Sequence, residues 1–223
     1  MDDPARMIAE GRVLVDGRVT LNPNSQVRRG AAISVQRPAP LRGEAKLRAA
    51  LEAFPVVVAG RTALDAGSSA GGFVRVLLER GARRVYAVDV GHGQLIGSLR
   101  QDARVTNLEG TNLSGLGPSL VPDPIGLFTL DLSYLSLAAA VPYLARVETT
   151  AGAALLALVK PMFELGLPQP PAAEAELEGA CALAERAIAA AGWSVLGRVR
   201  SPVLGARGAV EFWIHAGRGW AGP

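Results

Sequence analysis

The sequence predicts an α/β fold in which a mostly parallel, seven-stranded sheet is covered by helices on both faces. From residue 61 onward, apolar runs that suit buried strands alternate with segments of about ten residues that suit helices. In the stretch "LDAGSSAGGF", small residues separate the first such run from the first helix. The last two apolar runs are joined by the turn-rich "LGARG", which predicts a closing antiparallel pair.

The N-terminal fifth of the chain follows a different pattern. Residues 5–36 predict the end of a short helix followed by brief strands, and "VLVDGRVTL" alternates around Asp16-Gly17, a dipeptide typical of a type I′ hairpin. The proline-containing "RPAPLRG" predicts a linker. Residues 44–54 place apolar side chains at helical spacing.

The elements of the α/β part follow in order along the chain. We expect strands in "RTALDAG", "RVYAVDVG", "RVTNLEGTN", "IGLFTLDLSY", "GAALLALVKP", "WSVLGRVRSPV" and "AVEFWIHA". We expect helices at residues 71–80, in "GQLIGSLRQD", in "SLAAAVPYLARV" and at residues 172–192, where Gly192 ends an alanine-rich run.

Composition limits the class of protein. At 223 residues the chain can form one sizeable core, and 49% of its residues are hydrophobic. It has no apolar run long enough to span a bilayer, and its first residues lack the layout of a signal peptide. The single cysteine, Cys181, excludes an internal disulfide and suits a reducing compartment. We therefore expect a cytoplasmic protein with no membrane partner.

Basic residues are distributed in two informative ways. Residues 1–48 contain nine Lys/Arg against five Asp/Glu, whereas the remainder contains 14 against 15, so the positive excess is N-terminal and indicates an anionic partner there. All but two of the 23 basic residues are arginine; the exceptions are Lys46 and Lys160. Lysine can lose its proton in a desolvated site and arginine cannot, so both lysines are candidates for proton chemistry.

The small-residue loop indicates a nucleoside cofactor. Asp65 ends the first strand before this loop, and Asp89 ends the next strand, where a carboxylate can accept hydrogen bonds from a ribose. The loop is neither a dinucleotide fingerprint nor a P-loop, and Asp65 would repel a pyrophosphate. A carboxylate there suits the positive charges of S-adenosylmethionine. The alternative is a tight turn between strand and helix that binds no ligand.

Several segments resemble one known family. They are "GRVLVDGRV", "VRRGAAISV", "RGEAKL", "ALDAGSSAGGF", "RGARRVYAVDVGHGQL", "LDLSYLSL", "LVKPMFE" and "VEFWIHA". Together they resemble the TlyA (hemolysin A) family of ribosomal RNA 2′-O-methyltransferases, which is related to the FtsJ type. The resemblance implies a class I S-adenosylmethionine-dependent methyltransferase with a Rossmann-like sheet.

The resemblance also implies a catalytic tetrad of Lys46, Asp131, Lys160 and Glu211. Lys160 would lie next to the substrate hydroxyl and accept its proton, while Lys46 lowers the proton affinity of that amine. Asp131 and Glu211 would orient Lys160. Both lysines of the chain thus fall on tetrad positions.

For the cofactor, the resemblance implies a set of binding residues and no metal. Asp65 and the loop would surround the methionine part, Asp89 the ribose and Asn112 the adenine, with Asp131 close to both cofactor and tetrad. The loop residues implied are Gly67, Ser69, Gly71 and Phe73. We expect His92 to form a wall of the adenosine pocket and His215 to be structural.

The resemblance implies four parts. Residues 1–38 resemble the back half of an S4 RNA-binding domain, 39–43 a linker, 44–217 the methyltransferase domain and 218–223 a tail. Three departures affect RNA binding: the leading helix of the S4 domain, with its basic residues, is missing; the family's "ERTNAR" reads "EGTNLSG" here, which removes two arginines; and "FELGLPQPPAAEAE" contains no basic residue.

Three functional hypotheses remain open from the sequence. The first is methylation of a ribose 2′-hydroxyl in ribosomal RNA, with rRNA or a ribosomal subunit as partner. The second is a related reaction on a hydroxyl of a small-molecule substrate. The third is a non-catalytic binding module. A positive surface leading to the cavity would favour RNA, and a closed apolar pocket would favour a small molecule.

Overall fold

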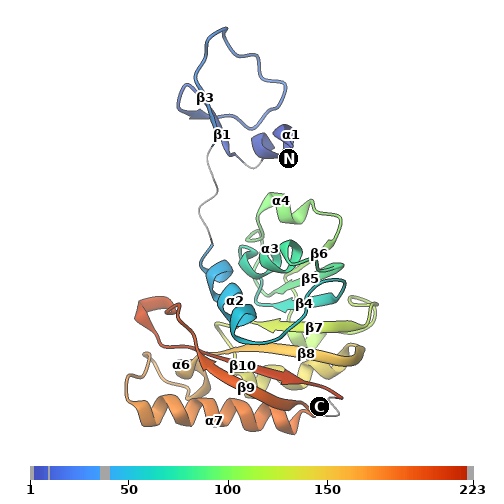
Figure 1. The fold of residues 1–223 in the computed structure, drawn as a ribbon, viewed down its shortest axis with the longest axis vertical. Helices are drawn as coiled ribbons and strands as arrows, with labels where there is room; N and C mark the ends of the chain where they lie inside the picture. The colour runs from blue at the N-terminus through green and yellow to red at the C-terminus, as the bar shows by residue number, and fades with distance from the viewer. Residues whose placement is uncertain (1–2, 10, 36–40, 220–223) are drawn as a thin grey trace.

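The computed structural model describes residues 3–9, 11–35 and 41–219, which form two separate sheets (Figure 1). A three-stranded sheet belongs to the N-terminal segment, and a seven-stranded sheet forms the body of the molecule. The expected linker (39–43) and tail (218–223) lie partly outside the described residues.

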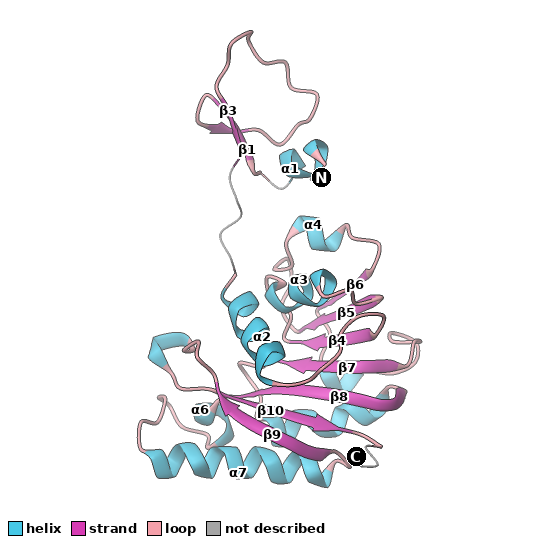
Figure 2. Cartoon of the chain, in the orientation of Figure 1, coloured by secondary structure: helices cyan, strands magenta, loops and turns pink. Residues whose placement is uncertain are grey.

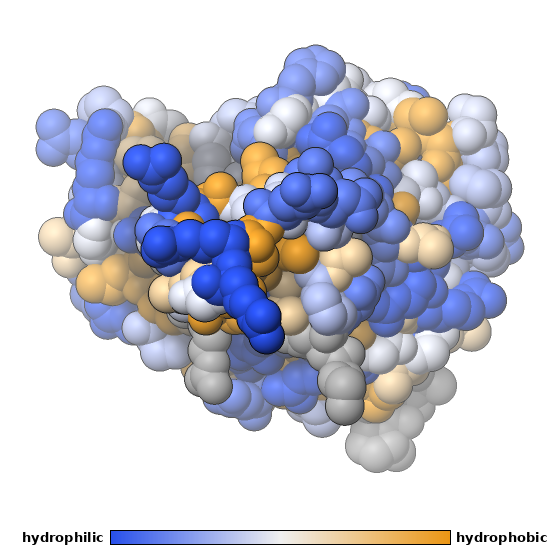
Figure 3. Space-filling view, turned by 90° about the horizontal axis from the view of Figure 1, so that it is seen from above, coloured by the Kyte–Doolittle hydropathy of each residue, from blue (hydrophilic) through white to orange (hydrophobic). Residues whose placement is uncertain are grey.

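The N-terminal segment consists of a short helix and a small antiparallel sheet. Helix α1 spans Pro4–Ala9, and strands β1 (Val13–Val15), β2 (Arg18–Val19) and β3 (Ile33–Val35) pair in the order β2-β1-β3. Asp16 and Gly17 have φ angles of 49° and 78°, which confirms the type I′ turn. Seen from this end of the molecule, most of the surface is hydrophilic, with apolar patches between (Figure 3). The likeness of this segment to an S4 domain stays a prediction.

The large sheet confirms the predicted α/β fold. Its strands are β4 (Thr62–Ala66), β5 (Arg84–Asp89), β6 (Val105–Glu109), β7 (Ile125–Leu130), β8 (Thr149–Val159), β9 (Ser194–Arg200) and β10 (Phe212–Gly217). They lie in the order β6-β5-β4-β7-β8-β10-β9. The pairs among β4 to β8 are parallel, and β10 runs antiparallel to both of its neighbours, as the last two apolar runs predict.

Helices cover both faces of the sheet (Figure 2). On one face lie α2 (Arg42–Ala53), α3 (Gly72–Glu79) and α4 (Gly97–Arg100); on the other lie α5 (Leu137–Ala140), the 3₁₀ helix η2 (Val141–Arg146) and α7 (Glu174–Ala190). Each group packs on its own hydrophobic core, one containing Leu47, Leu77 and Leu99 and the other Leu137, Leu144 and Leu177. Short elements complete the fold: η1 (Leu113–Gly115), α6 (Pro161–Glu164) and η3 (Ala206–Gly208).

Two expected helices are shorter than the sequence predicts. In residues 93–102 only Gly97–Arg100 is α-helical: Ile96 has an extended backbone (ψ 144°), and the preceding N–H groups of Gln94 and Leu95 donate to Glu109 at 2.6 and 2.9 Å. In residues 136–147 the α-helix ends at Ala140 and continues as 3₁₀ helix, with a proline at its start that lacks a backbone donor.

The strand order reverses between β4 and β7, and this is where a ligand cleft is expected in an open α/β sheet. The backbone N–H of Asp131, just after β7, donates to the carbonyl of Ala66 in β4 at 3.0 Å. This bond ties the two strand ends together. The loops that follow β4, β7 and β8 therefore begin from a fixed edge.

The glycines of the loop after β4 are required by contacts within the protein. Gly67 has φ +86°, and a Cβ built on it would lie 2.3 Å from the carbonyl oxygen of Asp131. A Cβ on Gly71 (φ +94°) would collide with Leu99, and one on Gly72 would lie 3.0 Å from the backbone nitrogen of Glu44. The small residues thus let the loop pack tightly between β7, α4 and α2, whatever else the loop binds.

We expect Gly67→Ala to destabilise the fold by about 2–4 kcal/mol, because the Cβ meets backbone at a positive φ. The matched control is Gly179→Ala in α7, where a Cβ meets no atom within 4 Å. The control should gain about 0.5–1 kcal/mol from helix propensity. Urea unfolding of both variants measures the difference, and equal stability of the two would contradict this account.

Candidate active site

Four charged side chains from distant parts of the chain meet at the carboxyl edge of the sheet. Lys46 comes from α2, Asp131 follows β7, Lys160 follows β8, and Glu211 precedes β10. Lys46 Nζ lies 2.6 Å from Glu211 Oε2 and 3.8 Å from Asp131 Oδ2. Lys160 Nζ lies 2.5 Å from Asp131 Oδ1. The four residues of the expected tetrad therefore form one continuous cluster, with Asp131 between the two lysines.

Lys46 and Glu211 form the buried half of this cluster. Their side chains are 5% and 4% exposed. Burial raises the pKa of the Glu211 carboxyl above its ordinary value, while the hydrogen bond and charge of Lys46 oppose that rise. Glu211 therefore holds a proton more readily than a free glutamate does.

Lys160 is the more accessible of the two lysines. Its side chain is 13% exposed, and its ammonium donates to Ser133 Oγ at 2.7 Å in addition to pairing with Asp131. Ser133 is not among the site residues expected from the sequence. Its position two residues after Asp131, at the end of a buried strand, was the available signal.

A cavity of about 550 Å³ connects the tetrad to the loop after β4. All four tetrad residues line it, together with Gly67, Ser68, Ser69, Ala70, Gly72 and Phe73 of the loop. Its remaining wall is largely apolar and includes Met162, Phe163, Pro170 and Pro171. The cavity thus places a pocket of ligand size directly beside an amine and a carboxylate.

Asp65 lies beneath the loop and does not line the cavity. It is fully buried, and one carboxylate oxygen accepts a hydrogen bond of 2.7 Å from the Thr129 hydroxyl. Desolvation raises the pKa of Asp65 to about 8; the charges of Asp131 and Asp89 add to the rise, and the Thr129 bond opposes it. Near neutral pH this side chain is therefore largely a buried neutral acid that supports the loop.

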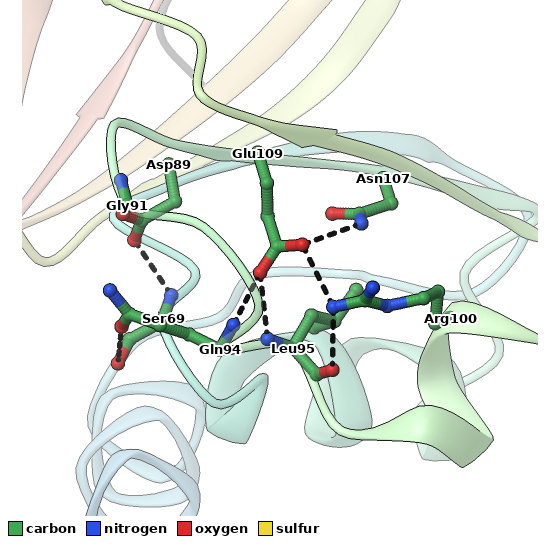
Figure 4. Close-up of polar contacts among 8 residues, drawn as sticks. All are labelled: Ser69, Asp89, Gly91, Gln94, Leu95, Arg100, Asn107 and Glu109. Atoms are coloured by element: carbon green, nitrogen blue, oxygen red, sulfur yellow. Dashed lines mark hydrogen bonds and ion pairs between the residues drawn. The ribbon is translucent and has the colours of Figure 1, made fainter.

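Asp89, at the end of β5, connects the loop after β4 to the loop after β5 (Figure 4). Its carboxylate accepts backbone hydrogen bonds from Ser69 at 2.8 Å and from Gly91 at 2.7 Å. The Ser69 hydroxyl donates to the side-chain carbonyl of Gln94 at 3.0 Å. A carboxylate offers about four acceptor positions, so Asp89 keeps capacity for ribose hydroxyls after these two bonds.

Glu109, at the end of β6, is a further organising residue that the sequence argument missed. Its carboxylate accepts hydrogen bonds from the backbone N–H groups of Gln94 and Leu95. It also accepts from the side chain of Asn107 at 2.9 Å and from that of Arg100 at 2.8 Å (Figure 4). These bonds, with Asn107 the largest contributor, lower the pKa of Glu109 to about 2. The carboxylate stays ionised and fixes the loop that follows Asp89.

The other expected residues lie outside the cavity lining. Asn112 is exposed and accepts from the backbone N–H of Ser114 at 2.9 Å, so it caps η1. His92 is exposed and packs against Gly110, whose hypothetical Cβ would lie 2.2 Å from the imidazole. His215 is buried against Phe54, and burial lowers its pKa, in keeping with a structural role.

Helix α2, which carries Lys46, is held against α3 by ion pairs. The buried Glu44 accepts from Arg75 at 2.6 Å and from the backbone N–H of Leu41 at 3.2 Å. Arg48 pairs with Glu79 of α3. These contacts fix the rotation of α2 and hence the direction of the Lys46 side chain.

Among the described residues, no group of three or more metal-ligating side chains could hold a metal ion. Within the same ranges, no helix is both long and apolar enough to cross a membrane.

Comparison with known proteins gives a consistent result. The family model described as FtsJ-like methyltransferase matches residues 40–218. The 16S/23S rRNA (cytidine-2′-O)-methyltransferase TlyA of Mycobacterium tuberculosis is 41% identical over 94% of this chain and 81% of its own. A hemolysin-type structure from Lactococcus lactis is 33% identical, with a TM-score of 0.75 over 80% of this chain and 88% of that one. The fold also resembles geranyl diphosphate methyltransferase in complex with S-adenosylmethionine, at 16% identity and a TM-score of 0.53 over 79% and 85% of the two chains.

We expect the stability of the protein to fall as pH rises from about 4 toward 8, in part because of Asp65. Its pKa is raised in the folded state, so between the ordinary value of 3.8 and about 8 the unfolded chain releases a proton that the folded chain keeps. Asp65→Asn removes this contribution, so the variant should exceed the wild type in stability by several kcal/mol at pH 8.5, at about 1.4 kcal/mol per pKa unit, with the gap closing toward pH 4.

Urea unfolding at pH 5, 7 and 8.5 measures the effect. Glu52→Gln, on the exposed surface of α2, is the control and should leave the pH profile of the wild type unchanged. An Asp65→Asn variant that is destabilised equally at all three pH values would show that the buried carboxyl does not titrate in this way.

Proposed function

The chain belongs to the FtsJ-like methyltransferase family, and on this premise we propose that it methylates a ribose 2′-hydroxyl of ribosomal RNA. It is an S-adenosylmethionine-dependent methyltransferase, and the proposal concerns its substrate and its catalytic groups. One observation carries the proposal: Lys46, Asp131, Lys160 and Glu211 gather at a cavity that is also lined by the loop after β4.

The cavity and its neighbouring loops fit the cofactor. Backbone at Gly67 and Ser69 can approach the methionine part closely, because the loop there has no bulky side chain, and Phe73 contributes an apolar wall. Asp89 retains acceptor capacity for the ribose hydroxyls. A role of Asn112 near the adenine rests on the family resemblance alone. The cofactor, when bound, supplies a methyl group on a positively charged sulfur. Asp65 contributes to this site by holding the loop from beneath.

The tetrad supplies a proton acceptor. A ribose hydroxyl is a weak nucleophile at neutral pH, so its proton needs a sink as the new carbon–oxygen bond forms. We assign this role to Lys160, because it is the more exposed lysine and because Ser133 and Asp131 fix the direction of its side chain. Lys46 is engaged with Glu211 on the buried side of the cluster, so Lys160 is the lysine left facing the cavity.

The relatives support RNA as the substrate. The Mycobacterium tuberculosis relative is named for 2′-O-methylation of cytidine in 16S and 23S rRNA, and it matches this chain over most of both sequences. A second curated relative, from Campylobacter jejuni, is named as a 23S rRNA (cytidine-2′-O)-methyltransferase and is 31% identical over 78% of this chain and 69% of its own.

A small-molecule hydroxyl is the second candidate substrate, and one observation favours it. The wall formed by Phe73, Met162, Phe163, Pro170 and Pro171 is apolar, as in many pockets that enclose small molecules. Incubation with radiolabelled cofactor and either ribosomal subunits or a small-metabolite extract separates the two candidates. Label in rRNA supports the first proposal, and label only in the extract supports the second.

We expect Lys160→Ala to lower kcat for methyl transfer by about 100-fold or more, since it removes the proposed base. Cofactor affinity, measured by calorimetry, should stay nearly unchanged. Lys160→Arg keeps the positive charge but cannot release its proton, so it should be as inactive as the alanine variant. Turnover retained by Lys160→Arg would show that a cation suffices there and would reject Lys160 as the base.

A further inference from the structure

Two arginines at the cavity have no carboxylate partner. Arg42 and Arg207 both line the cavity, and neither forms an ion pair within 4 Å among the described residues. Elsewhere in the body of the molecule, arginines such as Arg48, Arg75 and Arg100 bind carboxylates. Other exposed arginines, such as Arg186, likewise form no ion pair among the described residues; what distinguishes Arg42 and Arg207 is that they line the cavity.

The net charge of the cavity depends on this pair. Within the tetrad, the two lysines balance the two acids. The charged residues that line the cavity are Arg42, Lys46, Asp131, Lys160, Arg207 and Glu211, so the two arginines leave an excess of positive charge. S-adenosylmethionine itself carries more positive than negative charge, so this excess suits an anionic substrate better than the cofactor.

Arg42 is positioned by helix α2. It is the first residue of that helix and lies four residues before Lys46, so both residues occupy the same face. Because Lys46 points into the tetrad, Arg42 lies one helical turn away at the edge of the same cavity. It is exposed, whereas Lys46 is buried.

Arg207 is positioned by a tight loop above Glu211. The backbone N–H of Gly205 donates to Ala209 at 2.8 Å, and that of Ala209 donates to Ala206 at 3.1 Å, which closes the loop around Arg207. A Cβ on Gly205 would lie 2.1 Å from Glu211 Oε1, so the base of this loop rests on the tetrad carboxylate. The exposed tip therefore projects over the cavity.

The backbone of Arg207 adopts a conformation that a side chain disfavours. Its φ is 56°, in the left-handed region where glycine and asparagine are usual. An arginine in this region carries strain that a glycine would avoid. An arginine at a position where glycine would be less strained suggests that its side chain has a function at the cavity.

From these observations we propose that Arg42 and Arg207 bind the phosphodiester next to the target ribose and so place its hydroxyl at Lys160. This inference rests on the proposed function. Guanidinium groups bind phosphate oxygens through paired hydrogen bonds, and phosphates flank every ribose in an RNA strand. Two arginines of the family's "ERTNAR" segment are absent from this chain, and Arg42 and Arg207 supply basic groups at the cavity.

The test compares Arg42→Gln, Arg207→Gln and the double variant with Arg186→Gln. Arg186 is an exposed arginine on α7, which does not line the cavity. Methyl transfer to ribosomal subunits and binding of an RNA oligonucleotide are measured at several salt concentrations. Each cavity variant should raise KM by about 10-fold and lower the slope of log affinity against log salt by about one, while the control matches the wild type.

Arg207→Gly separates a functional role from a structural one. Glycine relieves the backbone strain, so the midpoint of thermal unfolding of the Arg207→Gly variant should equal or exceed that of the wild type. Its KM should nevertheless rise as it does in Arg207→Gln. A loss of both stability and activity would assign Arg207 a structural role and overturn the proposal for that residue.

Three outcomes distinguish the two proposals. If the wild type methylates no rRNA, the proposed function fails, and oligonucleotide binding still tests the pair. If the wild type is active and the cavity variants match Arg186→Gln in KM and salt slope, the phosphate site is rejected. If the variants instead weaken S-adenosylmethionine binding, measured by calorimetry, the arginines hold the cofactor carboxylate and the proposal is likewise overturned.

Discussion

The buried ion pair between Lys46 and Glu211 is the interaction on which the rest of the site depends. Removing two charges from water is costly, and a contact of 2.6 Å, with Asp131 3.8 Å from the same ammonium, offsets that cost. The pair joins α2, the first helix of the body, to the start of β10, its last strand. Loss of Lys46 would leave the buried Glu211 carboxylate without its closest counterion, so this contact supports the closure of the fold as well as the chemistry that we propose for the site.

The position of this pair depends in turn on how α2 is held. Glu44 binds Arg75 of α3, and the backbone of α2 passes so close to Gly72 that a methyl group there would meet it. Helix α3 begins directly after the loop that lines the cavity. The loop is therefore in direct backbone contact with the helix that carries Lys46. The tetrad and the loop that we propose binds the cofactor are thus packed against each other.

The sequence could predict the parts of this junction that depend on residue type and local spacing. The alternation of strands and helices predicted the sheet, the Asp16-Gly17 dipeptide predicted its turn, and the retention of lysine at two positions pointed to Lys46 and Lys160. The missed features depend on contacts between distant segments. Glu109 accepts hydrogen bonds from the backbone N–H groups of Gln94 and Leu95 and so holds, in a non-helical loop, residues for which periodicity alone favoured a helix. The burial of Asp65 and the left-handed backbone of Arg207 likewise follow from tertiary packing.

The contrast between lysine and arginine explains the division of tasks around the cavity. A residue that must release and accept a proton cannot be arginine, because the guanidinium stays charged at any pH the protein meets. A residue that must hold a phosphate gains from that same permanence and from its planar fork of donors. In a chain that otherwise uses arginine throughout, lysine occupies the two inner positions of the cluster and arginine the two unpaired positions at its edge. The choice of cation at each position thus matches the chemistry we propose for it.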